Sequence, residues 1–311
     1  MPETLLVGLA HPDDEIGCAG TLLAQRARGD RVVVVWLTRG EMTDALGDRD
    51  PAEVAALREA SGHEAGRLLD VETRFLDFPD TRLEATPDAA ARVASLVAEI
   101  RPTGLLTWGD AWTRGRRHPD HQACGKIFRD ALTLARIGRV VAPRPPHRAP
   151  VPVFTFRDVH SPLPAVAVEI APYRDRILAL AEHYRRLVGF GDPAWLQRLW
   201  AARGAPFGLA AAEVFDAWET EGGPVTTLLP ARPFVAEPHP EAAGRVGPPD
   251  RLAGQPPLQE GPADLVGRSG LDREEEPEGR EGDEPGRERD APWGRDPVEL
   301  DRRPRAGRLE E

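Results

Sequence analysis

Short apolar segments alternate with longer amphipathic segments from the N-terminus to about residue 230 of the chain. The apolar segments have the length of strands, and one contains four consecutive valines, as a strand buried on both faces would. The pattern predicts strands at residues 4–10, 31–38, 73–78, 104–108, 151–156 and 165–170. It predicts helices at residues 20–28, 51–69, 87–101, 118–136, 172–187 and 193–203. This alternation indicates a three-layer α/β fold with a mainly parallel sheet covered on both faces.

The composition changes after Pro230, where proline, glycine, arginine and acidic residues begin to dominate. The segment 273–286 contains almost no side chain that could be buried, so nothing would offset the entropy lost on ordering it. We therefore expect a folded domain at residues 1–234 and a disordered acidic tail at residues 235–311. Trp293 would be the anchor for a partner of this tail, but the sequence identifies no such partner.

Charge and cysteine content exclude several classes of protein. The net charge of −11 argues against nucleic acid as the main partner, because phosphate binding requires a basic surface. Two cysteines among 311 residues do not form a disulfide framework. The first apolar segment is too short to cross a bilayer, so we expect a cytoplasmic protein without membrane insertion. The sequence is compatible with a homo-oligomer.

Polar residues suited to chemistry follow four predicted strands, each at the carboxyl end of the strand. They are His11, Asp13 and Asp14 after the first strand, Arg39, Gly40 and Glu41 after the second, Asp80 after the third, and His118 and His121 after the fourth. In an open parallel sheet these ends share one edge, and ligand sites form there. The sequence therefore predicts that these residues meet in one crevice.

The residue types in this predicted crevice suit a zinc hydrolase. A catalytic zinc site commonly uses three protein ligands of the His and carboxylate type and leaves one position for water. His11 and Asp14 lie close enough in sequence to bind one ion from a single turn, and His121 would supply the third ligand. Asp13 would take a proton from metal-activated water. A lone Asp-Asp pair after a strand would more often be a helix cap.

Two further roles follow from the second cluster. His118 would stabilise the developing oxyanion or protonate the leaving amine, and Asp120 would orient His118 by a hydrogen bond. Cys18 and Cys124 lie near the two clusters and could be thiolate ligands, although apolar packing explains both of them better.

The chain resembles the PIG-L/LmbE-like zinc-dependent de-N-acetylases over about residues 3–190. The matching motifs are Ala10-His11-Pro12-Asp13-Asp14-Glu15, Gly17 with Gly20, Thr38-Arg39-Gly40-Glu41, Arg58-Glu59, Phe78-Pro79-Asp80 and His118-Pro119-Asp120-His121. The resemblance implies a Rossmann-like fold. It also implies a bound Zn²⁺ ion, or another divalent ion such as Fe²⁺. The implied reaction is hydrolysis of the acetamide of an N-acetylglucosamine unit in a small-molecule glycoside.

Carried over by position, the resemblance implies that His11, Asp14 and His121 bind the metal. It implies that Asp13 is the general base, that His118 is the general acid or oxyanion stabiliser, and that Asp120 supports His118. It places Arg39, Arg58 and Asp80 among the substrate contacts.

Two segments depart from the family pattern. Arg114, Arg116 and Arg117 occupy a loop in which mycothiol-pathway members carry a tyrosine, and they could bind an anionic aglycone. Many relatives have a histidine followed by a Ser/Thr-Gln pair late in the domain, whereas His183 is followed here by Tyr184-Arg185-Arg186.

Three functions remain open at this point. The first is deacetylation of an N-acetylglucosamine conjugate, and the second is hydrolysis of another amide, such as a thiol conjugate. The third is a non-catalytic sugar-binding or assembly module. Asp13 argues against the third function, because binding alone does not require a general base.

Overall fold

The computed structural model describes residues 2–110, 117–158, 160–189 and 192–231. The predicted tail at residues 235–311 lies outside the described residues, as do Arg114 and Arg116 of the arginine loop. No helix of the described residues is long and apolar enough to cross a membrane.

The described residues form one sheet in the strand order β3-β2-β1-β4-β5-β7-β6-β8. Its strands are β1 (Thr4–Leu9), β2 (Arg31–Trp36), β3 (Glu72–Phe75), β4 (Gly104–Thr107), β5 (Val153–Phe156), β6 (Ala165–Glu169), β7 (Ala212–Ala217) and β8 (Gly223–Val225). The first five strands in this order, from β3 through β2, β1 and β4 to β5, pair in parallel. Strand β7 lies antiparallel between β5 and β6. The predicted α/β fold with a mainly parallel sheet is confirmed.

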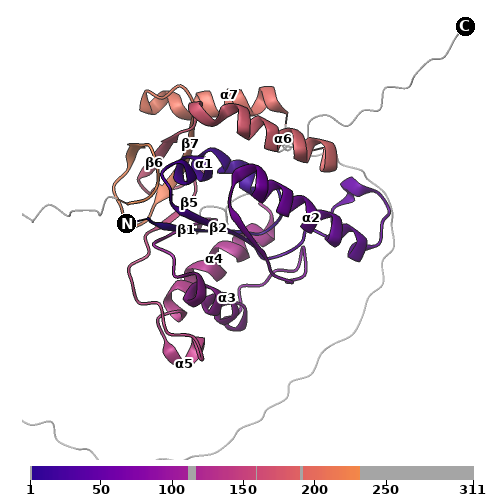
Figure 1. Cartoon of the computed structure of the whole chain (residues 1–311), viewed down its shortest axis with the longest axis vertical. Coiled ribbons are helices and arrows are strands. Elements are labelled where there is room, and N and C mark those ends of the chain that lie inside the picture. The colour runs from indigo at the N-terminus through magenta and orange to yellow at the C-terminus, as the bar shows by residue number, and fades with distance from the viewer. Residues whose placement is uncertain (1, 111–116, 159, 190–191, 232–311) are drawn as a thin grey trace, which may run out of the picture. The chain divides into compact units, whose positions relative to one another are not determined.

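Helices cover both faces of the sheet (Figure 1). They are α1 (Ala19–Ala27), α2 (Pro51–Leu69), α3 (Pro87–Ile100), α4 (Pro119–Leu134), α5 (Gly138–Val141), α6 (Arg174–Val188) and α7 (Pro193–Gly204). Helices α3 and α4 pack together on one face, and α1, α2 and α6 pack together on the other. All six predicted helices and all six predicted strands are present, and each end lies within three residues of its expected position.

Local sequence signals fix several helix starts. The Thr86 side chain accepts a hydrogen bond from the Ala89 amide at 3.2 Å, and Pro87 occupies the first helical position of α3. Asp50 caps α2 in the same way, with its carboxylate accepting from the Ala52 amide at 2.8 Å. These caps satisfy amides that have no partner within the helix.

The order of the strands reverses between β1 and β4, where the sequence predicts the crevice. The chain runs from β1 to β2 and β3 in one direction across the sheet, and from β4 to β5 in the other. Ligand sites of open α/β sheets form at such a reversal, outside the carboxyl ends of the strands. Gly125 lets α4 approach the end of β4, because a Cβ atom there would clash with the Trp108 carbonyl. The loops after β1 and β4 therefore face each other.

Candidate functional site

The turn after β1 is organised by Asp14. One carboxylate oxygen, Oδ2, accepts hydrogen bonds from the backbone amides of Ala10 and His11, both at 3.0 Å. The other oxygen, Oδ1, lies 3.1 Å from His121 Nε2, across the crevice. Burial would raise the pKa of Asp14, but the charges and hydrogen bonds of His121 and His11 hold that pKa below its usual range. Asp14 is therefore a carboxylate that joins the two predicted clusters.

Three histidine rings meet in the crevice. The centroid of the His11 ring lies 4.6 Å from that of His118 and 5.3 Å from that of His121. The ring of Trp108 stacks on His121 at 3.8 Å and fixes its plane. His118 is the exposed member and caps α4, where its Nδ1 atom accepts from the Asp120 amide at 3.2 Å. The ring nitrogens of the three histidines lie close enough together to bind one metal ion.

The inner side of the His11 ring faces two buried carboxylates. His11 Nε2 lies 3.1 Å from Asp80 Oδ1 and 3.2 Å from Asp120 Oδ2, while Nδ1 lies 4.0 Å from Asp14. Burial would lower the pKa of His11, but hydrogen bonds to Asp120 and Asp80 and the nearby negative charges raise it to about 10. Three carboxylates around one imidazole therefore favour a positive charge in the crevice, as a divalent cation would also supply.

The role of Asp120 differs from its prediction. Its carboxylate was expected to orient His118, but it contacts His11 instead. It also accepts hydrogen bonds from the amides of Thr81 at 2.8 Å and Leu83 at 3.3 Å. The first turn of α4 directs this side chain inward, since Asp120 is fully buried whereas His118 is exposed. With Nε2 of His11 facing Asp120, Nδ1 is the ring nitrogen that faces Asp14.

Two of the three predicted substrate contacts, Arg58 and Asp80, are buried. Asp80 is buried, and besides His11 it accepts from the Met42 amide at 2.9 Å, which places it beneath the loop after β2. Arg58 is buried on α2 and donates to Asp13 Oδ2 at 3.0 Å and to the Pro12 carbonyl. Arg39 is more accessible and forms an ion pair with Glu59 at 3.0 Å.

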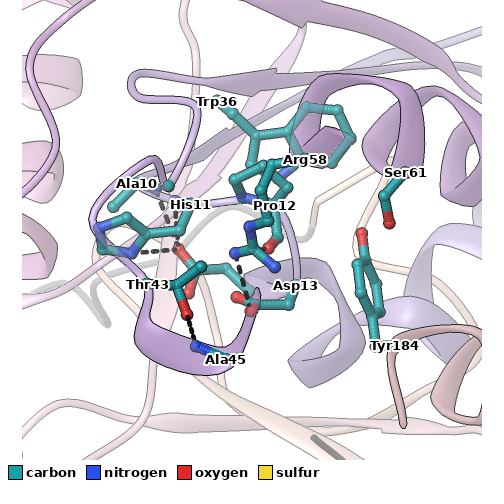
Figure 2. A network of polar contacts seen from close by, with 12 residues as sticks. Ala10, His11, Pro12, Asp13, Trp36, Thr43, Ala45, Arg58, Ser61 and Tyr184 are labelled. Atoms are coloured by element: carbon teal, nitrogen blue, oxygen red, sulfur yellow. Dashed lines mark hydrogen bonds and ion pairs between the residues drawn. The ribbon is translucent and has the colours of Figure 1, made fainter. Parts of the chain in front are cut away.

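Asp13 has an uncommon backbone conformation, with φ of 124° and ψ of −20°. This region is sparsely populated by residues other than glycine, so the surrounding contacts must hold it. Burial raises the pKa of the Asp13 carboxyl, and the neighbouring guanidinium of Arg58 opposes that rise. Asp13 is held by Arg58, as Figure 2 shows.

Three residues that the sequence did not single out as site residues lie behind Asp13. Glu15 is fully buried and accepts from the Asp13 amide at 3.0 Å and from Trp36 Nε1 at 3.2 Å. The Tyr184 hydroxyl of α6 donates to its other oxygen. Burial raises the pKa of Glu15 to about 7, although the hydrogen bond from Tyr184 opposes the rise. Glu15 belongs to the first motif, but no local pattern linked it to Tyr184.

The remaining candidates take structural positions. Cys18 and Cys124 are buried free thiols, and burial raises the pKa of each well above its usual value. Arg117, the described member of the arginine loop, pairs with the buried Asp158, with Nε to Oδ2 at 3.2 Å.

Part of the chain is similar to known deacetylases. Residues 6–132 match the family model described as PIG-L, GlcNAc-PI de-N-acetylase. A diacetylchitobiose deacetylase of Thermococcus kodakarensis is 32% identical over 127 residues, which cover 40% of this chain and 47% of that relative. A 1D-myo-inositol 2-acetamido-2-deoxy-alpha-D-glucopyranoside deacetylase of Nakamurella multipartita is 32% identical over 181 residues, which cover 46% of this chain and 61% of that relative. The chain thus spans about half to three fifths of the length of these curated relatives.

The fold has a counterpart among solved structures. A conserved protein of Thermus thermophilus is 30% identical, with a TM-score of 0.59, and the match covers 70% of this chain and 94% of that chain. Both histidine clusters lie within the matched residues 6–132. Residues 6–132 therefore carry a domain of the PIG-L family.

Proposed function

We propose that this protein hydrolyses the acetamide of an N-acetylglucosamine unit in a small-molecule glycoside, releasing acetate and a free amine. The observation that carries the proposal is the meeting of Asp13, Asp14 and three histidines at the point where the strand order reverses. The relatives named above, which are deacetylases of acetamido sugars, support the choice of substrate class.

The donor set fits a divalent cation, Zn²⁺ or alternatively Fe²⁺. His11, Asp14 and His121 would hold it, because Asp14 lies within 4.0 Å of a ring nitrogen of each histidine. When bound, the ion supplies a Lewis acid that polarises the amide carbonyl and makes water more acidic. Asp80 and Asp120 hold the His11 ring from its far side, and Trp108 holds the plane of His121.

The proton would be moved by Asp13 and His118. Asp13 Oδ2 is held by Arg58, and its carboxylate would accept the proton of the attacking water as general base. His118 is exposed and caps α4, and its outward nitrogen would donate to the oxyanion or to the departing amine. Asp120 would act through His11 and not through His118.

Recognition of the sugar would fall to residues at the rim of the crevice. Arg39 lies in the loop after β2, with a side chain 41% exposed, so it remains a candidate for a substrate contact. The buried contacts of Arg58 and Asp80 give these two residues the role of holding Asp13 and His11 in place. We place this activity in the cytoplasm.

The proposal is tested by screening the metal-loaded protein for acetate release from a panel of N-acetylglucosaminides, with amide conjugates of thiols as the competing substrate class. We expect acetate from the glucosaminides and none after Asp13→Ala. Full activity of Asp13→Ala would overturn the mechanism. Release of product from the thiol conjugates alone would assign the second function considered above.

A further inference from the structure

The conformation of Asp13 depends on contacts at its own amide and at the preceding carbonyl. Its own amide donates to Glu15 Oε2 at 3.0 Å, and the preceding carbonyl, of Pro12, accepts from Arg58. Because φ of 124° is unfavourable for an L-residue, the loss of either contact would let the backbone relax toward a common conformation. Such a relaxation would move the carboxylate away from the crevice.

Glu15 is held in turn by two donors from different parts of the fold. Trp36 Nε1 donates from the carboxyl end of β2, the strand between β3 and β1. The Tyr184 hydroxyl donates from α6, and Tyr184 lies 169 residues beyond Glu15 in the sequence. A buried carboxylate requires such donors. If one donor is removed, the Glu15 side chain can move to form a hydrogen bond with another group.

Helix α6 is fixed to the helix that carries Arg58. His183 Nε2 lies 2.8 Å from the Ser61 hydroxyl of α2, one turn beyond Arg58. Figure 2 shows Arg58 joined to Asp13, with Tyr184 approaching from another side. Both helices therefore hold Asp13. Helix α2 contacts the Asp13 carboxylate through Arg58, and helix α6 acts on the Asp13 amide through Tyr184 and Glu15.

We propose that Tyr184 is a positioning residue, which fixes the orientation of Asp13 by hydrogen bonding to Glu15. Tyr184 lies outside the matched residues 6–132 and at a segment that departs from the family pattern. The inference rests on the proposed function in so far as Asp13 is the general base. The effect of the Tyr184–Glu15 contact on the backbone order of residues 13–15 can be measured without any activity.

The test compares Tyr184→Phe with Tyr173→Phe in the metal-loaded full-length protein. Both variants remove one hydroxyl, and Tyr173 lies in the turn that precedes α6. We expect Tyr184→Phe to lower kcat by about 10- to 100-fold with little change in KM, because a displaced base affects the transition state and not substrate binding. Metal content should be unchanged in both variants, and Tyr173→Phe should keep the wild-type kcat.

Two further measurements separate positioning from a purely structural role. Tyr184→Phe should have little further effect on the residual rate of Asp13→Asn, because the base through which Tyr184 acts is then absent. Glu15→Gln, which keeps an acceptor for the Asp13 amide, should retain more activity than Glu15→Leu. In hydrogen exchange measured by mass spectrometry, the peptide containing residues 10–16 should exchange faster in Tyr184→Phe than in Tyr173→Phe.

The outcomes distinguish the two proposals. A wild-type protein that releases no acetate would refute the proposed function, and the hydrogen exchange would still test the contact. An active wild-type protein with equal kcat in Tyr184→Phe would overturn the inference. A lower melting temperature of Tyr184→Phe without any change in kcat or in exchange at residues 10–16 would overturn it as well.

Discussion

Replacing Arg58 by methionine tests how the candidate base is held. The Arg58 side chain is 4% exposed and that of Asp13 is 25% exposed, and their atoms lie 3.0 Å apart. Methionine preserves much of the apolar stem of arginine but leaves the Asp13 carboxylate and the Pro12 carbonyl without their donor.

The expected loss of stability follows from these exposures. Breaking a fully buried ion pair by removing one partner costs about 3–5 kcal/mol. Asp13 is partly solvated, which reduces this cost, whereas the lost donor to the Pro12 carbonyl adds about 1 kcal/mol. We therefore expect the free energy of unfolding to fall by about 2–4 kcal/mol in Arg58→Met.

The assay is urea unfolding in the presence of EDTA, which keeps metal binding out of the comparison. Asp13→Asn is the second single variant, because asparagine tolerates a positive φ. Each single variant leaves one unpaired charge, whereas the double variant leaves none, so we expect the double variant to be about 1–3 kcal/mol more stable than additivity predicts. Strict additivity would refute the view that the pair holds Asp13.

Four further outcomes are expected. His11→Ala and His121→Ala should lose bound metal, as measured by mass spectrometry of the metal content. His118→Ala should keep the metal and lose turnover by about 10²- to 10⁴-fold. Equal metal loss in all three variants would contradict these separate roles. In metal-free protein the pKa of His11 is raised to about 10, so its contribution to stability should be complete below pH 6.5 and be lost as the pH rises toward 10. His11→Gln should remove this decrease from the urea-unfolding profile between pH 6.5 and 10. Gly125→Ala should lower the free energy of unfolding by about 1–3 kcal/mol, because its Cβ meets the Trp108 carbonyl, and an unchanged urea midpoint would argue against this close approach. A protein ending at residue 234 should unfold with the same midpoint as the full chain if residues 235–311 add nothing to the folded domain.

Much of the secondary structure could be predicted because its signals are local. Thr86 with Pro87 starts α3, and four consecutive valines form the centre of β2. Strand β7 was missed because Glu213 and Asp216 interrupt its apolar pattern although the strand is buried throughout. Its carboxylates find donors in distant segments, such as the Gly20 amide at 3.0 Å, which the sequence around β7 does not reveal.

The sequence by itself determined which residues are candidates for the chemistry of the site. Histidines and carboxylates follow strands β1 and β4, and a parallel sheet brings the carboxyl ends of its strands to one edge. The tertiary structure decided which partner each of them has. Asp120 contacts His11 instead of His118, Arg58 holds Asp13, and Tyr184 reaches Glu15. These contacts depend on how α2, α4 and α6 pack against the sheet, and periodicity along a chain specifies the buried face of a helix but not the side chain that it meets.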